Sequence, residues 1–144
     1  MQNYHRHSSY SNIFVPDSSA VNEDYAKRAV ELNQKIICSL EHGWQGYYYE
    51  TFELAQKYNL KFVFGAEAYW VKNRFEKDKT NCHIVVLAKN ESGRRDINSI
   101  LSEANLTGFY NRPRIDEVLI FQLNPENVFI TLACIAFWNY KEEY

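Results

Sequence analysis

The sequence lacks a long apolar run. No window of its 144 residues approaches the ~18 apolar residues of a transmembrane helix. The N-terminus is polar and does not show the charged-then-apolar pattern of a secretory signal. We therefore expect a cytoplasmic protein that makes no membrane contact.

Cysteine is also scarce. The three cysteines, Cys38, Cys82 and Cys134, form an odd set without a C-x-x-C pair. Such a set is not the framework of a disulfide-stabilised secreted domain. It favours reduced thiols, which agrees with a cytoplasmic location.

An excess of basic charge is missing as well. Lys and Arg number 16 against 18 Asp and Glu, which gives a net charge of −2. This balance argues against a module that binds duplex nucleic acid through its backbone charge alone. It does not exclude an enzyme that handles phosphate through metal ions. The composition, 46% hydrophobic and 24% charged, is that of one globular domain with a real core.

Strand and helix patterns alternate along the chain. Short runs bounded by turn residues predict strands at 3–7, 36–40, 61–64, 83–88 and 127–133. Helical spacing predicts helices at 21–34, 45–58, 94–104 and 116–121. This rhythm is typical of parallel β/α units, so we expect an α/β fold with ligands at the C-terminal strand ends.

Metal-ligating residue types gather at those expected strand ends. His5 and His7 are two apart, so in an extended segment both side chains leave the same face. His42 follows the second strand, Glu67 the third and Cys134 the fifth. Imidazole and carboxylate groups suit divalent transition metals, so this pattern indicates a metal site.

His83 does not fit this pattern simply. It stands at the start of its predicted strand, which is the wrong end in an all-parallel sheet. Either that strand begins earlier, or the polar excursion at 72–81 folds over the site. The run Tyr47-Tyr48-Tyr49 is ambiguous too, because it can stack a base or simply begin a packed helix.

The ordered motifs resemble the PHP (polymerase and histidinol phosphatase) domain family, in the form found at the N-terminus of bacterial DNA polymerase III alpha subunits. The motifs are His5-x-His7-Ser8, Glu41-His42-Gly43, Gly65-x-Glu67-x-Tyr69, His83 with Leu87-Ala88-Lys89-Asn90, Arg112-Pro113-Arg114-Ile115-Asp116 and Ile130-Thr131-Leu132-Ala133-Cys134. The resemblance implies an incomplete PHP-type β/α barrel, with about five of seven parallel strands. It also implies up to three divalent metals, namely zinc, manganese or iron.

Site residues follow from the resemblance position by position. The implied metal ligands are His5, His7, Asp17, His42, Glu67, His83 and Cys134. Glu67, as a bridging carboxylate, and His42 are the implied catalytic residues. Arg112 and Arg114 are candidates for contacting phosphate or DNA, with ordinary surface or helix-capping cations as the alternative.

Two departures from the family pattern affect these expectations. Glu41 stands where the family usually has Asp, so it is either a supporting group or a lost ligand. The last family motif, Asp-x-His, is absent, so we expect residues 1–144 to form a partial PHP domain without polymerase domains.

Three functions remain open. The chain can be part of a polymerase III alpha-type replicase, with a phosphoesterase or 3′–5′ exonuclease site acting on single-stranded DNA or another phosphodiester. It can be a stand-alone phosphatase of the histidinol-phosphatase type. It can also be a non-catalytic fragment that pairs with the rest of a replicase on another chain.

Overall fold

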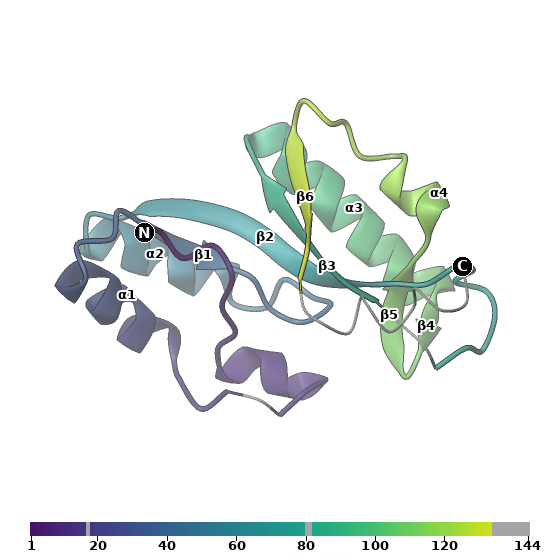
Figure 1. The fold of residues 1–144 in the computed structure, drawn as a ribbon, viewed down its shortest axis with the longest axis horizontal. Helices are drawn as coiled ribbons and strands as arrows, with labels where there is room; N and C mark the ends of the chain where they lie inside the picture. The colour runs from purple at the N-terminus through teal and green to yellow at the C-terminus, as the bar shows by residue number, and fades with distance from the viewer. Residues whose placement is uncertain (17, 80–81, 134–144) are drawn as a thin grey trace.

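The long strand β2, Lys61–Trp70, is the element around which the others are arranged (Figure 1). The computed structural model describes residues 1–16, 18–79 and 82–133. The remaining strands are β1 Ile36–Ser39, β3 Cys82–Ala88, β4 Phe109–Tyr110, β5 Arg112–Ile115 and β6 Val128–Leu132. The helices are the 3-10 helix η1 Ser9–Ile13 and the α-helices α1 Asn22–Glu31, α2 Tyr48–Lys57, α3 Glu91–Thr107 and α4 Glu117–Ile120.

Both edges of β2 are paired. β3 runs antiparallel to it over 65–70, while β1 and β5 pair with it in parallel over 61–64 and 69–70. β6 is antiparallel to β3, and β4 is antiparallel to β5. β1, β2, β5 and β6 therefore share one direction, and β3 and β4 run the opposite way.

The expected α/β class is confirmed, but the all-parallel arrangement is wrong for β3. A parallel return beside β2 needs a crossover of about a dozen residues or more, usually containing a helix. Only residues 71–81 separate β2 from β3, and the described part of that segment holds neither helix nor strand. The chain therefore reverses direction after β2, and β3 runs antiparallel beside it.

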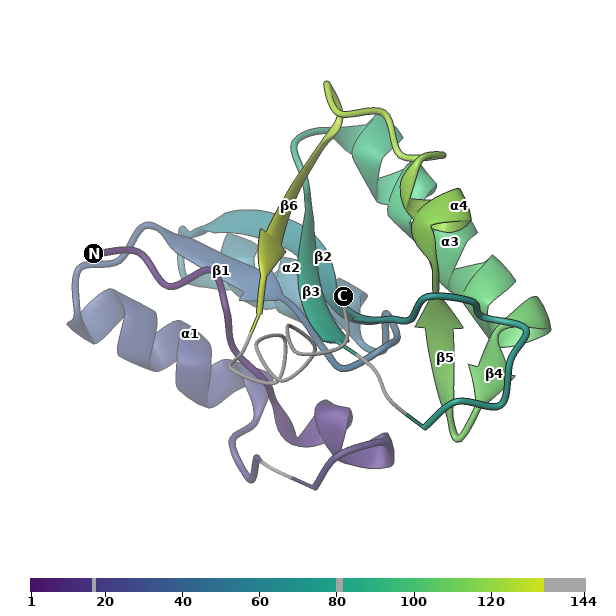
Figure 2. The same cartoon turned by 45° about the vertical axis from the view of Figure 1, so that its right-hand side comes forward.

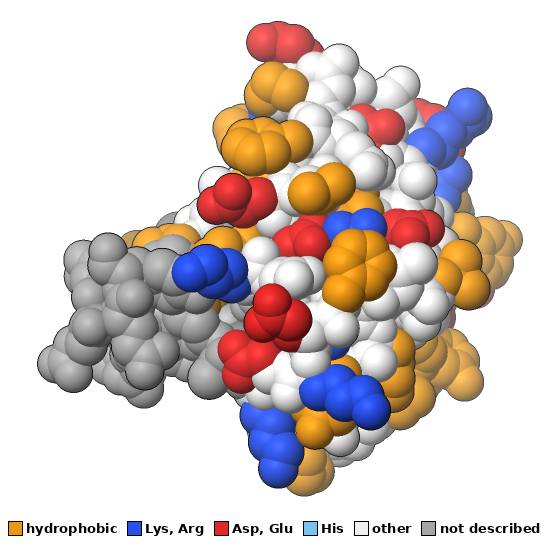
Figure 3. All heavy atoms as spheres, turned by 90° about the vertical axis from the view of Figure 1, so that its right-hand side faces the viewer, with side chains coloured by type: hydrophobic (Ala, Val, Ile, Leu, Met, Phe, Trp, Pro, Cys, Tyr) orange, Lys and Arg blue, Asp and Glu red, His pale blue; other side chains and the backbone are white. Residues whose placement is uncertain are grey.

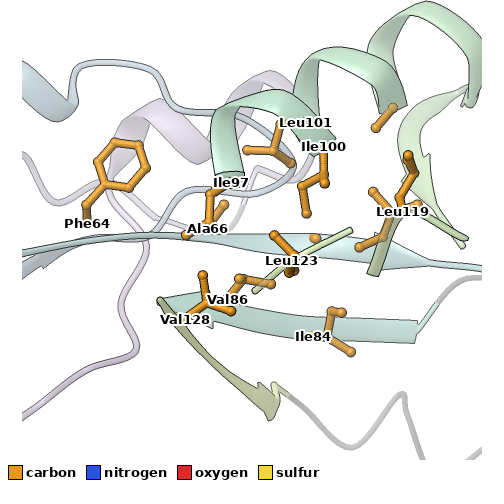
Figure 4. Packing of buried hydrophobic residues seen from close by; sticks show 13 residues of the cluster. Phe64, Ala66, Ile84, Val86, Ile97, Ile100, Leu101, Leu119, Leu123 and Val128 are labelled. Carbon is orange, nitrogen blue, oxygen red and sulfur yellow. The ribbon is translucent and has the colours of Figure 1, made fainter. Parts of the chain in front are cut away.

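The two faces of the β2–β3 pair differ in the side chains that they carry. Side chains alternate between faces, so Ala66 and Ala68 share one face with their partner-strand neighbours Ile84 and Val86. This face packs against α3 in the largest hydrophobic cluster (Figure 4). Glu67 is on the opposite face.

A second hydrophobic cluster joins α1 and α2 to β1. Its buried members are Ala26, Ile37, Leu54 and Ala55. The N-terminal segment runs beside β1 to reach η1 (Figure 2). A hydrogen bond ties this segment to the residue before β1: the Lys35 N–H donates to the Gln2 side-chain oxygen, 2.7 Å.

Several element boundaries differ from expectation. Residues 3–7 are not a strand, because within the described residues they pair with no neighbouring strand. β2 continues through Glu67, so this residue is within a strand rather than after it. The region 105–113, for which neither helix nor strand was expected, contains the last residues of α3, β4 and the start of β5. The helix expected at 116–121 is α4, and the Asp116 side chain caps it by accepting a hydrogen bond from the Leu119 N–H.

None of the described helices is both long and apolar enough to cross a lipid bilayer.

Candidate metal centre

Glu67 lies at the middle of a cluster of all four histidines. It is 1% exposed and projects from β2. His42 reaches it because the chain after β1 continues alongside β2, forming a parallel bridge between His42 and Glu67. The backbone bonds of that bridge are Glu67 N–H to Glu41 O, 3.1 Å, and Gly43 N–H to Glu67 O, 2.7 Å.

The Oε2 atom of Glu67 faces the N-terminal histidines. It lies 2.5 Å from His5 Nε2 and 3.0 Å from His7 Nε2. The two histidine nitrogens are 3.1 Å apart. The prediction that His5 and His7 share one space is confirmed, although their segment is not a strand.

The Oε1 atom faces the other two histidines. It lies 2.5 Å from His83 Nδ1 and 3.5 Å from His42 Nδ1. The rings of His42 and His7 stack with centroids 3.9 Å apart. Two groups of three potential ligands therefore share one carboxylate, each group with all its ligand atoms within 4.8 Å of one another.

The position of His83 follows from the direction of β3. His83 pairs with Tyr69, two residues beyond Glu67. Because β3 is antiparallel, its first residues lie beside the last residues of β2. β3 also begins at Cys82, one residue earlier than expected, so His83 lies inside the strand, as the first of the two expected explanations has it.

Hydrogen bonding decides the charge of Glu67. Burial by itself raises the pKa of this carboxyl group, but hydrogen bonds from His5, His7 and His83 outweigh that effect. They hold the pKa of Glu67 well below its usual range, so the group is a carboxylate at neutral pH.

Glu41 supports the site rather than joining it. Its carboxylate accepts hydrogen bonds from the Ser8 N–H, the Ser8 hydroxyl and the Ser11 hydroxyl, at 3.1, 2.5 and 2.5 Å. Ser11 Oγ in turn accepts the His42 N–H and contacts His7 Nδ1, both at 3.2 Å. Of the two expectations for Glu41, this geometry matches the supporting group.

These bonds show that the site suits a cation. The only hydroxyl hydrogen of Ser11 is donated to Glu41, so His7 Nδ1 must be the donor in its contact with Ser11. With Nδ1 donating to Ser11, the ring can donate to Glu67 from Nε2 only when both nitrogens carry a proton, and a neutral ring turns its Nε2 lone pair towards the carboxylate. A lone pair and a carboxylate repel each other, so a cation between them, either a metal ion or a proton on the ring, stabilises this arrangement. The donor set of imidazoles and carboxylate fits a divalent metal ion.

Gly43 makes close packing beside the cluster feasible. Its φ is +68°, a left-handed conformation that side chains rarely adopt. A Cβ there would approach the Tyr69 ring to 2.8 Å and Pro113 to 3.0 Å. Tyr69 is fully buried, and its ring centroid is 5.0 Å from that of His83.

The two candidate phosphate-binding arginines differ. The Arg112 guanidinium lies 4.9 Å from the centre of the Tyr69 ring, at the edge of the histidine cluster. Arg114 is 3% exposed, and its nitrogens donate to backbone oxygens of Gly108, Glu76, Asp78 and Arg74 at 2.7–3.0 Å. The expectation that Arg114 contacts phosphate is contradicted, because its N–H groups are already bonded to backbone carbonyl oxygens inside the fold.

Two expected ligands, Asp17 and Cys134, lie outside the described residues. Sequence reasoning gave no role to Ser11 or Tyr69, although both carry a positional signal. Ser11 follows His7 by four residues, and Tyr69 follows Glu67 by two within a strand, which places it on the same face.

Comparisons with known proteins agree with this geometry. Residues 3–137 match the model of the PHP domain family. A DNA polymerase III subunit alpha of Borreliella burgdorferi is 32% identical over 138 residues, which cover 92% of this chain and 12% of that protein. The subunit of Treponema pallidum is 28% identical over 138 residues, with the same two coverages. The chain thus spans only a small part of the relatives it matches.

A solved structure supports the fold alone. It is of a Bifidobacterium adolescentis protein described as a metal-dependent phosphoesterase. The two chains superpose with a TM-score of 0.50 at 17% identity, over 71% of this chain and 32% of the other.

Proposed function

This chain belongs to the PHP domain family, and from that premise we propose that it is the phosphoesterase module of a polymerase III alpha-type replicase. One observation carries the proposal. The two oxygens of buried Glu67 each face two histidines, which gives adjacent ligand groups joined by one carboxylate. Such paired sites are typical of enzymes that cleave phosphate esters.

The four histidines and Glu67 would bind the cations, and Arg112 would contact the phosphate. His5 and His7 would hold one divalent cation, His42 and His83 would hold another, and Glu67 would contribute to both groups. Bound divalent cations would supply the charge that polarises a phosphoryl oxygen and lowers the pKa of a water molecule. Glu67 and His42 are the proposed catalytic residues because their ligand atoms, 3.5 Å apart, would hold a cation at the centre of the cluster. Arg112, beside Tyr69, neutralises part of the charge of a phosphate entering the site.

The substrate class is a phosphodiester, with the 3′ end of single-stranded DNA as the specific proposal. The rest of the replicase is the proposed partner, in the same or another chain. The surface over the β4–β5 end carries Lys and Arg interspersed with Asp and Glu (Figure 3). On the described part of that face the two signs of charge alternate, so backbone charge alone would not hold a nucleic acid there.

The proposal is tested by counting metal and measuring hydrolysis. We expect the purified chain to bind at least two Zn²⁺ or Mn²⁺ ions and to hydrolyse a 3′-ended oligonucleotide faster than a small phosphate monoester. Glu67→Gln should lose both ions and at least about 100-fold in rate. Glu53→Gln, which changes an exposed carboxylate on α2, is the matched control. Less than one ion per wild-type chain, or unchanged hydrolysis by Glu67→Gln, would contradict the proposal.

A second candidate function, a non-catalytic subunit that pairs with another chain, is favoured by one observation. In the described residues β6 pairs with β3 alone, and its side chains Phe129, Ile130 and Leu132 are exposed. An apolar edge strand is a template for another strand. Sedimentation at increasing concentration tests this candidate, and a monomer at every concentration would count against it.

A further inference from the structure

Three aromatic side chains, Tyr10, Trp44 and Tyr47, form a cluster directly beside the histidines. Tyr10 precedes Ser11, whose hydroxyl contacts His7, and Trp44 follows His42 by two residues. The two segments are tied by a hydrogen bond from Trp44 Nε1–H to the Tyr10 carbonyl oxygen, 3.1 Å. Tyr10 thus follows the proposed ligand His7 by three residues, and Trp44 follows the proposed ligand His42 by two.

The rings are arranged face to face and face to edge. Tyr10 and Tyr47 stack with centroids 3.9 Å apart and planes inclined by 12°. Trp44 meets Tyr47 nearly perpendicularly, with centroids 6.3 Å apart. Tyr47 is 54% exposed, and none of the three belongs to the hydrophobic core clusters. The cluster therefore presents an aromatic surface to solvent instead of filling the interior.

The backbone holds Tyr47 in an unfavourable conformation to achieve this. Its φ is +58°, in the left-handed region that a bulky side chain rarely adopts. The preceding Gly46 is needed as well, because a Cβ there would lie 2.1 Å from the Trp44 ring. Strain of this kind, maintained beside a site, is a reason to look for a function.

We propose that this aromatic cluster is a base-stacking subsite, so that the substrate is a phosphate ester carrying a nucleobase. The inference rests on the proposed function, since it places the base beside the group that would hold the phosphate. A base stacks on aromatic rings through its π-face, with little dependence on its identity. The base would lie against Tyr47, and its own phosphate would lie at the histidine cluster.

Tyr49 supplies the matched comparison. It is 60% exposed and belongs to the same helix, but its ring contacts Phe52, at 6.2 Å between centroids, and no residue of the aromatic cluster in the described contacts. A general effect of exposed tyrosines on binding would therefore be the same for Tyr49 and Tyr47, whereas a subsite involves Tyr47 alone.

The test compares ligands that differ only in the base. Probes are trithymidylate against an abasic trimer with the same phosphates, and thymidine monophosphate against deoxyribose 5-phosphate. We expect the base to strengthen binding about five-fold or more in the wild-type chain. The Trp44 indole N–H signal in NMR spectra, assigned with Trp44→Phe, should shift with the base-containing probes only. Comparing the trimer with the monophosphate distinguishes a strand end from a free nucleotide.

The key variant is Tyr47→Asn. Asn tolerates the left-handed conformation, so the variant should unfold at the same or a higher temperature than the wild type. We expect it to lose the preference for the base, and Tyr49→Asn to keep it. Equal binding of both probes by the wild type, or an unchanged preference in Tyr47→Asn, would overturn the inference. These binding readouts are separate from the metal count and hydrolysis that test the proposed function.

Discussion

The two faces of the β2–β3 pair are stabilised by different physics. On one face, small and branched apolar side chains such as Ala66 and Val86 pack against α3. On the other, the carboxylate of Glu67 is buried among four histidines. The apolar face is stabilised by removing surface from water, which needs no partner of a particular type. The buried polar groups of the other face each need a hydrogen-bond partner or an opposite charge, because burying them without one is unfavourable.

The face that packs against α3 therefore serves stability alone. The Glu67 face carries the candidate site together with a smaller hydrophobic cluster, whose buried members are Cys38, Leu40, Val85 and Leu87. The chain offers variants that affect either stability or metal binding and leave the other unchanged.

The largest loss of stability should come from Ile97→Ala. Ile97 is fully buried at the centre of the α3 face (Figure 4). Its truncation leaves a cavity that should lower the free energy of unfolding by about 3 kcal/mol, measured by urea denaturation. Metal binding by the folded fraction should be unchanged. Val118→Ala, on exposed α4, is the control and should stay within about 0.5 kcal/mol of wild type. A loss of metal stoichiometry in Ile97→Ala would show that the faces are coupled.

An intermediate effect is expected from the arginine pair. Arg114→Met removes the donor of a buried hydrogen bond to the Arg74 carbonyl oxygen and of a half-buried one to the Glu76 carbonyl oxygen, and should lower the free energy of unfolding by about 2 kcal/mol. Arg112→Met should leave stability within about 0.5 kcal/mol but weaken the binding of inorganic phosphate to the metal-loaded chain a few-fold. The comparison fails if Arg112→Met is the more destabilising of the two.

The smallest effect concerns an exposed carboxylate, Glu23, which contrasts with buried Glu67. Hydrogen bonds from Lys57 and Tyr58 lower the pKa of Glu23 from 4.5 to about 2. A lowered pKa stabilises the fold above the unfolded value of 4.5, and this contribution is lost as pH falls towards about 2. Glu23→Gln should lower the melting temperature by no more than about 2 °C at pH 7, with no difference near pH 2. A difference that grew on acidification would contradict this assignment.

Much of the fold could be predicted from local pattern. The strand at 36–39, the helix at 48–57 and the Asp116 cap follow from apolar spacing and capping chemistry. The direction of β3 was mispredicted because the alternation of strands and helices was extended across residues 71–81. The length of that connection already argued for an antiparallel return.

The candidate site was predictable in its members but not in its pairing. His5, His7, His42, Glu67 and His83 all lie at the cluster, as their residue types and motif order indicated. Arg114 was misassigned because a guanidinium in a sequence carries no sign of whether carbonyl oxygens surround it. The aromatic cluster was missed because Tyr10 and Tyr47 are far apart in the chain and meet only through the fold.

The sequence by itself determined the chemistry available to this protein: an H-x-H pair, two further histidines and one carboxylate shortly after an apolar run. Side-chain type and spacing are local properties, so they can be read without coordinates. Only the tertiary structure decided that Glu67 uses one oxygen for His5 and His7 and the other for His42 and His83. His42 and His83 reach the same oxygen from segments that pair with opposite edges of β2, and His5 and His7 reach the other oxygen from the N-terminal segment. Such an arrangement is set by contacts between distant residues rather than by neighbours in the chain.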